Sequence, residues 1–299
     1  MSEIVPDLPR RDVHEANRRS WNAATEAHNR HKGDQAAFLR AGGSTLFPEE
    51  LALLGDVDGR ALVHLQCNAG QDTLSLARLG ARATGVDISD EAVAFARRLS
   101  AESGIAARFE RADVYDWLRD ARGGGRRFDV AFSSYGVLSW LSDLRAWARG
   151  IADVLAPGGR LVLVEFHPVL GMFDEELALR HPYSGGGAPI PVAEGIGDYV
   201  ADSAGGLLPE GGAPAGEAFR NPHPTYEFAW GLGDVVQAVV DAGLRIGELR
   251  EWPYSNGYRP FHEMVMEPGR RWRLPDGVPA LPLMFGLVAH KAEDTGAAD

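Results

Sequence analysis

The sequence contains a single cysteine, Cys67, and no long apolar run. One cysteine excludes an internal disulfide and a cysteine-based zinc site. No apolar segment approaches the ~20 residues that a membrane-spanning helix requires. Residues 1–30 carry mixed charges where a secretory signal would have an apolar core. These absences predict a cytoplasmic protein without a membrane partner.

Basic residues are outnumbered by acidic ones, 30 Lys and Arg against 42 Asp and Glu, which gives a formal net charge of −12. Nucleic-acid binding depends on clustered Lys and Arg, so the balance argues against a nucleic-acid partner. The 45% hydrophobic and 24% charged content is ordinary for a globular protein, and 299 residues suffice for one large core with an insertion. The sequence carries no signal of oligomeric state.

The most informative stretch is residues 62–89. A short apolar run at 61–65 is long enough for one buried strand, and a polar turn follows at 66–72. A helical stripe then ends at Gly80, and a second apolar run ends on an acid, Asp87. Strand, turn, helix, strand and terminal acid, with about 20 residues between the turn and the acid, predict the first half of a nucleotide-binding α/β domain.

Strand and helix patterns continue to alternate up to residue 166, which predicts a parallel sheet with helices on both faces. The expected further strands lie at 107–111, 128–132, 161–165, 244–252 and 283–289, and a loop containing residues 254–258 is expected between the last two. The expected helices lie at 10–32, 48–54, 90–103, 141–155 and 230–243.

Residues 167–228 break this alternation, because they are rich in Gly and Pro and have no sustained periodicity. An insertion of this length is more typical of a lid or cap than of a simple connection. We therefore expect an N-terminal helical cover of the cofactor at 1–55, a core at 56–166 and 229–292, a cap or substrate insertion at 167–228 and a disordered tail at 293–299.

The segment 61–166 resembles the core of the class I S-adenosylmethionine-dependent methyltransferases. The phrases NRRSWNAAT, GGSTLFPEE, VEFHP, GDYVAD and LPLMFGLVAHK resemble one bacterial subgroup that acts on small molecules. The resemblance implies an α/β fold, a Rossmann-like three-layer sandwich with a mostly parallel seven-stranded sheet and an antiparallel last strand, plus N-terminal helices and the cap insertion. It also implies S-adenosyl-L-methionine as cofactor, S-adenosyl-L-homocysteine as product and a small-molecule acceptor, such as a secondary metabolite.

The first motif of this family is an acid followed by glycines at alternate positions. Here His64 replaces the acid, Gln66 and Asn68 replace two glycines, and only Gly70 stands in place. Asn tolerates a positive φ better than most residues. The resemblance still implies that this turn, with Cys67 as a packed loop residue, approaches the methionine part of the cofactor.

The resemblance implies roles for further residues of the cofactor site. Asp87 is expected to accept hydrogen bonds from the ribose hydroxyls, and Asp113 from the adenine amino group, with the Val114 amide beside it. Ile88 and Tyr115 either flank the adenine or belong to the core. The remaining expected residues line the sulfonium and substrate side or cover the cofactor: Ser133, Ser134, Tyr135, Trp21 and His28.

Glu165 and His167 end the fifth expected strand, and residues i and i+2 of an extended segment point the same way. A carboxylate with an imidazole could accept a proton from the acceptor, so both are candidate catalytic residues. Alternatively, they form a structural hydrogen-bonded pair that orders the next segment.

Residues 221–230 contribute His223, Tyr226, Glu227 and Trp230. With Ser134, the residues His223, Tyr226 and Trp230 are expected to line the substrate pocket, or else they pack the cap. Zinc binding by His167, His181 and His223 is a weaker alternative, because their spacing matches no ligand pattern, so no metal is expected.

The sequence therefore predicts an S-adenosylmethionine-dependent methyltransferase. C-methylation of an isoprenoid is an alternative, motivated by Glu165 with the aromatic Trp230 and Tyr226. A non-catalytic cofactor-binding or interaction protein is a second one, because the glycine turn is degenerate. A dinucleotide oxidoreductase is disfavoured, because the turn lacks the first two glycines of G-x-G-x-x-G.

Overall fold

The computed structural model describes residues 9–209 and 218–294. Its centre is a seven-stranded sheet in which β12 runs antiparallel to both neighbours, while the pairs formed by β1 to β5 are parallel. The strand order is β3 (Arg108–Arg111), β2 (Arg82–Asp87), β1 (Ala61–Leu65), β4 (Phe128–Ser134), β5 (Leu155–Phe166), β12 (Met284–His290) and β8 (Arg245–Trp252). The predicted Rossmann-like sheet with an antiparallel last strand is confirmed.

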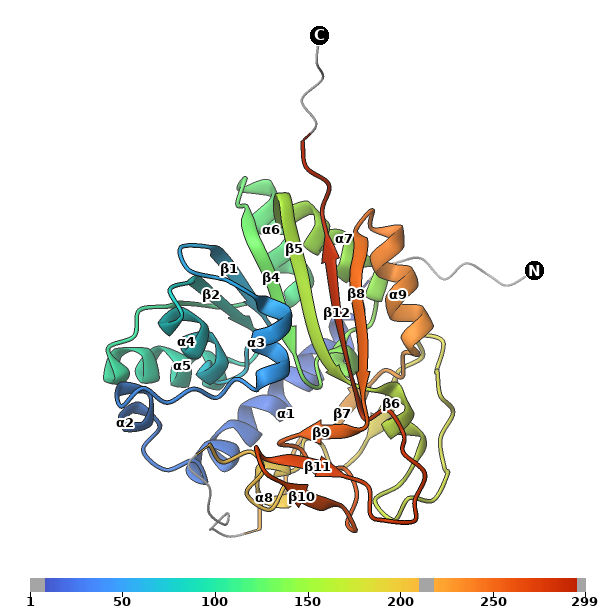
Figure 1. Cartoon of the computed structure of the whole chain (residues 1–299). Coiled ribbons are helices and arrows are strands. Elements are labelled where there is room, and N and C mark those ends of the chain that lie inside the picture. Colours follow the sequence, from blue (N-terminus) through green and yellow to red (C-terminus); the bar gives the residue numbers. More distant parts are fainter. Residues whose placement is uncertain (1–8, 210–217, 295–299) are drawn as a thin grey trace, which may run out of the picture.

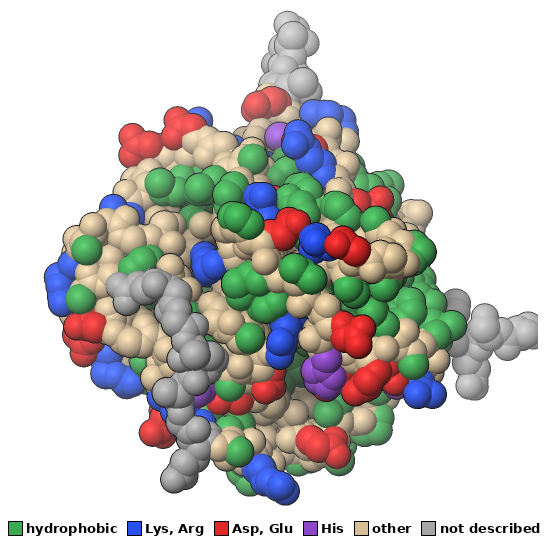
Figure 2. Space-filling view, turned by 60° about the horizontal axis from the view of Figure 1, so that its bottom comes forward, with side chains coloured by type: hydrophobic (Ala, Val, Ile, Leu, Met, Phe, Trp, Pro, Cys, Tyr) green, Lys and Arg blue, Asp and Glu red, His purple; other side chains and the backbone are tan. Residues whose placement is uncertain are grey.

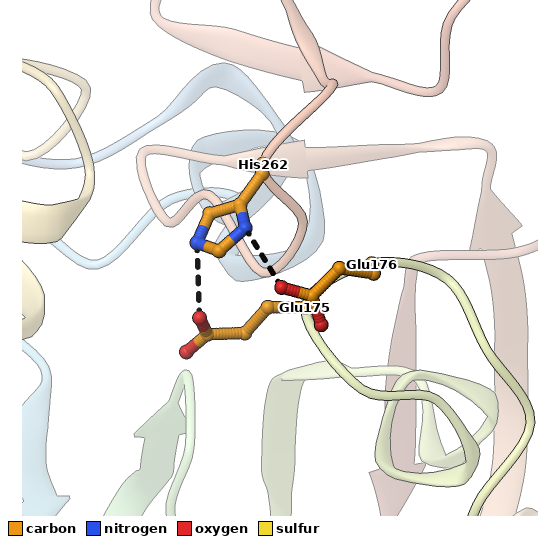
Figure 3. A group of neighbouring side chains, drawn as sticks. All are labelled: Glu175, Glu176 and His262. Atoms are coloured by element: carbon orange, nitrogen blue, oxygen red, sulfur yellow. Dashed lines mark ion pairs between the residues drawn. The ribbon is translucent and has the colours of Figure 1, made fainter.

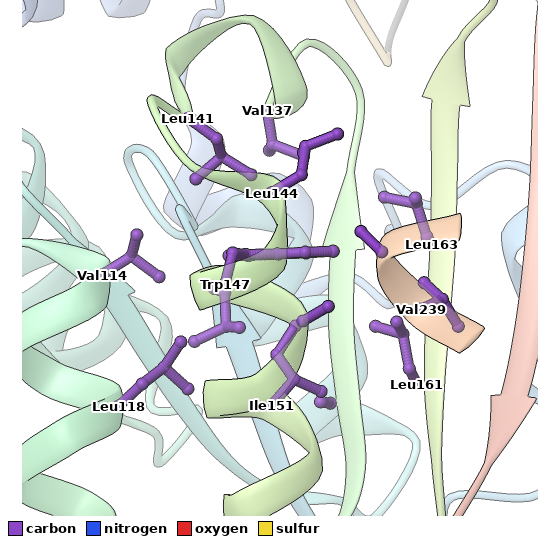
Figure 4. Packing of buried hydrophobic residues seen from close by; sticks show 14 of the residues in the cluster. Val114, Leu118, Val137, Leu141, Leu144, Trp147, Ile151, Leu161, Leu163 and Val239 are labelled. Atoms are coloured by element: carbon purple, nitrogen blue, oxygen red, sulfur yellow. The ribbon is translucent and has the colours of Figure 1, made fainter. Parts of the chain in front are cut away.

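Side-chain alternation along the strands gives the sheet two buried faces. Val63 and Leu163 belong to one apolar cluster, and their neighbours Leu62 and Val162 belong to another. The first cluster lies under α6 (Val114–Gly123), α7 (Leu144–Val154) and α9 (Leu232–Asp241), and Trp147 of α7, 1% exposed, packs at its centre (Figure 4). The opposite face is covered by α2 (Gln35–Arg40), α3 (Pro48–Leu54), α4 (Gln71–Arg78) and α5 (Asp90–Ser103). These are the three layers that the sequence predicted.

A second group of elements lies beneath the carboxyl ends of the parallel strands (Figure 1). The long helix α1 (Arg11–Arg30) crosses there and contacts both α5 and β7. The others are η1 (Leu138–Trp140), η2 (Pro168–Met172), the antiparallel pair β6 (Ile190–Val192) and β7 (Thr225–Glu227), α8 (Tyr199–Asp202), and a three-stranded sheet of β9 (Tyr254–Asn256), β10 (Val265–Glu267) and β11 (Arg271–Arg273). These elements close the edge of the sheet at which α/β proteins bind ligands.

Two local predictions are wrong. Residues 254–258, expected as a loop, include β9, which pairs with β11, and strands of three residues are too short to show periodicity. Residues 114–123 were not expected to be helical, but they form α6, whose N-cap Asp113 accepts a hydrogen bond from Tyr115 N at 2.9 Å. The domain boundaries stay a prediction, and residues 295–299 of the expected tail lie outside the described residues.

The surface beneath the sheet carries charges of both signs. Figure 2 shows Lys and Arg interspersed with Asp and Glu over the described part of this face, without a large basic area. Among the described residues, no helix has the length and apolar character needed to cross a membrane.

Candidate active site

A cavity of about 550 Å³ lies at the carboxyl ends of the parallel strands. Its volume falls within the roughly 300–1,000 Å³ that is usual for small-molecule sites. It is walled by the ends of β1, β2, β4 and β5, by α1, by residues 195–209 and by residues 256–270. Of the predicted cofactor and pocket residues, it brings together Trp21, Gln66, Cys67, Asn68, Asp87, Ile88, Asp113, Val114, Ser134 and Tyr135.

The turn after β1 keeps a glycine-type backbone although it has lost two glycines. Gln66 and Asn68 have φ values of 57° and 49°, and Gly70 has 81°. Side-chain bonds accompany these left-handed conformations, since Gln66 Nε2 donates to Val137 O at 3.0 Å and Asn68 Oδ1 accepts from Ala69 N at 2.7 Å. Gln66 and Asn68 therefore adopt the left-handed backbone that glycine favours, and Gly70 belongs to the same turn without lining the cavity.

Asp87 ends β2 and faces the cavity. Its Oδ2 accepts a hydrogen bond from Asn68 N at 2.8 Å, and its Oδ1 accepts one from Ser89 N at 2.8 Å. Burial raises the pKa of Asp87, and these backbone bonds oppose the rise. A carboxylate has about four lone-pair positions, so Asp87 keeps acceptor capacity for a ligand.

Asp113 is tied to α1 by a histidine that sequence reasoning missed. His14 Nδ1 lies 2.7 Å from Asp113 Oδ2, and the His14 ring stacks on Tyr115 with centroids 5.4 Å apart and an interplanar angle of 8°. Burial raises the pKa of Asp113, but the hydrogen bond from His14 and the nearby positive charge of Arg11 bring it below its ordinary value. His14 carried no local signal, because its partner is 99 positions away.

Aromatic side chains from three segments cover the cavity beside α1. Trp21 meets Trp140 and Tyr199 edge-on, with ring centroids 5.4 and 6.3 Å apart. His28, predicted with Trp21, does not line the cavity but packs 4.2 Å from the Tyr199 ring. Burial lowers the pKa of His28 to about 4. Tyr199 also accepts a hydrogen bond from Asn68 Nδ2 at 3.3 Å, and only the GDYVAD phrase pointed to its segment.

The opposite half of the cavity has an aromatic wall, of which the sequence predicted only Tyr135 as a site residue. Phe47 and Tyr135 lie 6.1 Å apart between ring centroids, Tyr135 and Phe166 5.4 Å, and Phe166 and Tyr258 5.1 Å. Four segments far apart in the chain contribute these rings, so no local sequence pattern predicts that they form one wall.

Glu165, expected as a catalytic base, does not line the cavity. Its carboxylate accepts backbone hydrogen bonds from Gly136 N, from Val137 N at 2.7 Å, from Leu138 N at 3.0 Å and from Phe166 N at 2.6 Å. Burial raises the pKa of Glu165, and these four bonds oppose the rise. Because side chains alternate along β5, Phe166 faces the cavity and Glu165 instead orders the backbone around η1.

His167 is also outside the cavity lining. Its Nδ1 accepts a hydrogen bond from Val169 N at 3.2 Å, and its Nε2 lies 2.9 Å from Glu251 Oε1. The alternative of a Glu165–His167 pair is not seen either, because each side chain has other partners. The rule that residues i and i+2 share a face does not carry past Phe166, where β5 ends.

The predicted pocket residues of segment 221–230 attach that segment to the rest of the chain and do not line the cavity. The His223 carbonyl accepts from Ser20 Oγ at 3.0 Å, and the backbone of Tyr226 exchanges two 2.8 Å hydrogen bonds with the Asn17 side chain. The lining residues do include Glu227, whose pKa is raised by burial.

Two predicted side chains pack into the body of the fold: Trp230, which is partly buried, and Ser133, which is buried. Trp230 Nε1 donates to Leu141 O at 2.8 Å, and its ring packs against the apolar cluster under α6, α7 and α9. Ser133 is 0% exposed and faces away from the cavity, whereas the next residue, Ser134, lines it. Alternation along β4 explains the difference.

One group of side chains with metal-ligating atoms occurs among the described residues, and it lies outside the cavity (Figure 3). His262 pairs with Glu175 at 2.9 Å and with Glu176 at 3.4 Å. All three side chains are more than half exposed, so the cluster serves as a surface contact between two loops. Within the described residues, His167, His181 and His223 do not form such a group.

Comparison with known proteins concerns mainly the part of the chain that includes residues 66–115, which line the half of the cavity around Asp87 and Asp113. Residues 63–159 match the family model described as a methyltransferase domain. A ubiquinone biosynthesis O-methyltransferase of Xanthomonas axonopodis pv. citri is 34% identical over 105 residues, which are 35% of this chain and 42% of that protein. One from Chelativorans sp. is 25% identical over 152 residues, 50% of this chain and 58% of that protein. The chain therefore aligns with less than two thirds of these relatives.

Solved structures resemble nearly the whole chain. The CcbJ methyltransferase from Streptomyces caelestis aligns with a TM-score of 0.53 at 15% identity, covering 92% of this chain and 99% of that one. Magnesium protoporphyrin IX methyltransferase from Synechocystis PCC 6803, solved with S-adenosylhomocysteine, aligns with a TM-score of 0.51 at 17% identity, covering 94% and 100%. At these identities the likeness shows the fold.

Proposed function

We propose that this chain, which is built on a class I S-adenosylmethionine-dependent methyltransferase domain, transfers the methyl group of S-adenosylmethionine to an oxygen atom of a small-molecule acceptor. One observation carries the proposal: the glycine-type turn 66–70 and the carboxylate of Asp87 meet in one cavity at the carboxyl edge of the sheet. The names of the curated relatives support oxygen as the acceptor atom.

The residues that line the first half of the cavity fit this cofactor. Asp87 would accept hydrogen bonds from the ribose, and Asp113, held by His14, would lie at the adenine end. Gln66 Oε1 is buried without a hydrogen-bond partner, and it would face the methionine part together with the backbone amides of the turn. Bound S-adenosylmethionine supplies a methyl group made electrophilic by its sulfonium sulfur.

The protein's own contribution is positioning and exclusion of water. The cover formed by Trp21, Trp140 and Tyr199 shields the cavity, and the aromatic wall opposite gives the acceptor a fixed surface. Holding two reactants in one orientation removes a large part of the entropic barrier of a displacement reaction. Glu165 takes part indirectly, because its carboxylate orders the backbone of residues 136–138 at the cavity wall.

The alternatives from the sequence are separable. Isoprenoid C-methylation was suggested by Glu165 together with Tyr226 and Trp230. None of the three side chains lines the cavity, so the structure gives this alternative no support. A non-catalytic binding protein differs from the proposal only in turnover. We place the protein in the cytoplasm, with no nucleic-acid or membrane partner, as part of the same proposal.

The test is a methyl-transfer assay with S-adenosylmethionine labelled in its methyl group and a panel of oxygen, nitrogen and carbon acceptors. We expect label in oxygen acceptors and a strong loss of turnover in Asp87→Ala. The matched control is Asp153→Asn, a half-exposed acid paired with Arg122 on the surface, which should behave as wild type. Cofactor binding without transfer to any acceptor would favour the non-catalytic alternative, and label only in nitrogen or carbon acceptors would contradict the proposed acceptor atom.

A further inference from the structure

Arg270 is a partly buried cation in the wall of the cavity and has no carboxylate partner. Its guanidinium lies 4.3 Å from the centroid of the Phe47 ring, and its Nη1 donates to Gly206 O at 3.3 Å. Among the described residues no carboxylate oxygen lies within 4.0 Å of it, whereas Arg271 pairs with Glu49 and Arg273 with Glu267. Burial lowers the pKa of Arg270, and the acidic groups of Asp72 and Glu50 oppose this from a distance without contacting the guanidinium. A ligand carboxylate in direct contact would supply the charge-assisted hydrogen bonds that the buried guanidinium lacks.

Two buried oxygen atoms that line the same cavity are also unpaired. Glu50 is 1% exposed, and while its Oε2 accepts from Phe47 N at 2.6 Å, its Oε1 has no partner. Burial raises the pKa of Glu50 well above its ordinary value, which favours the protonated carboxyl group. Asn256 is 1% exposed, and its Nδ2 donates to Glu49 Oε2 at 2.8 Å and to Tyr135 Oη at 3.0 Å, but its Oδ1 accepts nothing. Buried polar atoms are rarely left without partners, so a ligand group that both donates and accepts hydrogen bonds, such as a hydroxyl, fits between them.

Two residues of the cavity wall near this group of side chains have an unusual backbone conformation. Arg270 has a φ of 62°, and Tyr135, at the wall between the two halves of the cavity, has 32°. Non-glycine residues adopt such angles at an energetic cost, and they concentrate at functional sites. Arg270 is therefore held in a strained conformation where a glycine would be relaxed.

The shape of the subsite is set by the aromatic wall of Phe47, Tyr135, Phe166 and Tyr258. Rings pack well against rings, so this wall favours a flat, aromatic body. An isoprenoid chain would leave Glu50, Asn256 and Arg270 unpaired, and a cationic amine would meet the unpaired charge of Arg270.

We infer that Glu50, Asn256 and Arg270 form the acceptor subsite, and that it takes a small aromatic compound carrying a carboxylate and a hydroxyl group. Arg270 pairs with the carboxylate, and the hydroxyl group donates its one hydrogen to Asn256 Oδ1 and accepts a hydrogen bond from the Glu50 carboxyl group. The inference rests on the proposed methyl transfer, because it assigns the acceptor of that reaction.

The experiment is calorimetry on the full chain saturated with S-adenosylhomocysteine, with matched one-ring probes. The probes are 4-hydroxyphenylacetate, its uncharged primary amide, the cationic analogue tyramine and the hydroxyl-free phenylacetate. We expect the hydroxy acid to bind about 10-fold more tightly than the amide and phenylacetate, and tyramine to bind most weakly, since one charge-assisted hydrogen bond changes affinity by about that factor.

Variants assign the effects to residues. Arg270→Gln should lower the affinity for the hydroxy acid to that for the amide, while the affinity for the amide stays unchanged. Arg270→Lys should keep part of the preference for the hydroxy acid over the amide. Glu50→Ala should remove the preference for the hydroxyl. Arg273→Gln, an arginine on β11 paired with Glu267, is the matched control and should bind all probes as wild type does.

The outcomes separate this inference from the proposed function. If the wild-type chain fails to bind S-adenosylhomocysteine, the proposed function is wrong. If the chain binds S-adenosylhomocysteine but binds the acid, the amide and the amine with equal affinity, or binds none of them at ~10 mM, the acceptor inference is wrong. Retained S-adenosylhomocysteine affinity in each variant shows that its fold and cofactor half are intact.

Discussion

The two halves of the cavity are built in different ways. The cofactor half comes mainly from residues 66–115, where consecutive strands and turns place Asn68, Asp87 and Asp113 along one edge of the sheet. The acceptor half joins Glu50, Arg270 and other residues contributed by α3, β4, β5 and the small sheet. The family match at 63–159 covers the first half and omits Glu50 and Arg270. The proposed donor site thus lies mainly within one stretch of sequence, while the inferred acceptor site joins segments that are far apart in the chain.

Asp87→Ala should break the cofactor half alone and have the largest effect. We expect the affinity for S-adenosylhomocysteine to fall about 10- to 100-fold, the loss of one or two charge-assisted hydrogen bonds. Calorimetry measures it, with Asp153→Asn as control. Unchanged affinity in Asp87→Ala would remove Asp87 from the site.

Acidification should weaken the fold through His28 and His64. Burial lowers the pKa of each to about 4, against about 6.5 in an unfolded chain. As the pH falls, the unfolded chain binds protons before the folded chain does, so the free energy of unfolding decreases. The contribution of each neutral histidine is complete above pH ~6.5 and is lost as the pH falls to ~4, by up to about 3 kcal/mol per histidine.

Urea unfolding between pH 7 and pH 4.5 measures this dependence. His64→Gln should be less stable than wild type at pH 7 but show a shallower decline with acid. An equal slope in both proteins would show that His64 is not held neutral.

Glu165→Gln separates a structural role from a catalytic one. The amide can accept fewer of the four backbone hydrogen bonds, so we expect unfolding free energy to drop by about 1–3 kcal/mol. Glu251→Gln, at the half-exposed partner of His167, is the control and should change stability little. A catalytic base would instead lose turnover while keeping wild-type stability and cofactor affinity.

Trp21→Ala should have the smallest effect, confined to the cover. Losing its edge-on contacts with Trp140 and Tyr199 removes about 0.5–1.5 kcal/mol per ring pair from the cover. We expect the equivalent of about one pair to be lost from binding, so affinity for S-adenosylhomocysteine should fall about 2- to 10-fold. Fluorescence titration of the remaining tryptophans can follow binding. A loss as large as that of Asp87→Ala would mean that Trp21 contacts the cofactor's polar groups rather than covering it.

The sequence predicted the sheet and named most of the residues between 66 and 115 that line the cavity, because strand periodicity, the 66–70 turn and the acids at the ends of β2 and β3 are local signals. Their role in holding the cofactor stays a prediction. The sequence made Glu165 a catalytic candidate because this acid lies near the end of a core strand, but alternation along β5 turns Phe166 to the cavity, and the Glu165 carboxylate meets the amides of residues 136–138. It missed Glu50 and Arg270 because their meeting depends on packing between distant segments. His14 was missed for the same reason.

The most direct test of the central claim is calorimetric titration of S-adenosylhomocysteine into the wild-type chain. The account predicts saturable binding with one ligand per chain, weakened in Asp87→Ala and unaffected in Arg270→Gln. Absence of binding at ~1 mM, or binding that Asp87→Ala leaves unchanged, would contradict it.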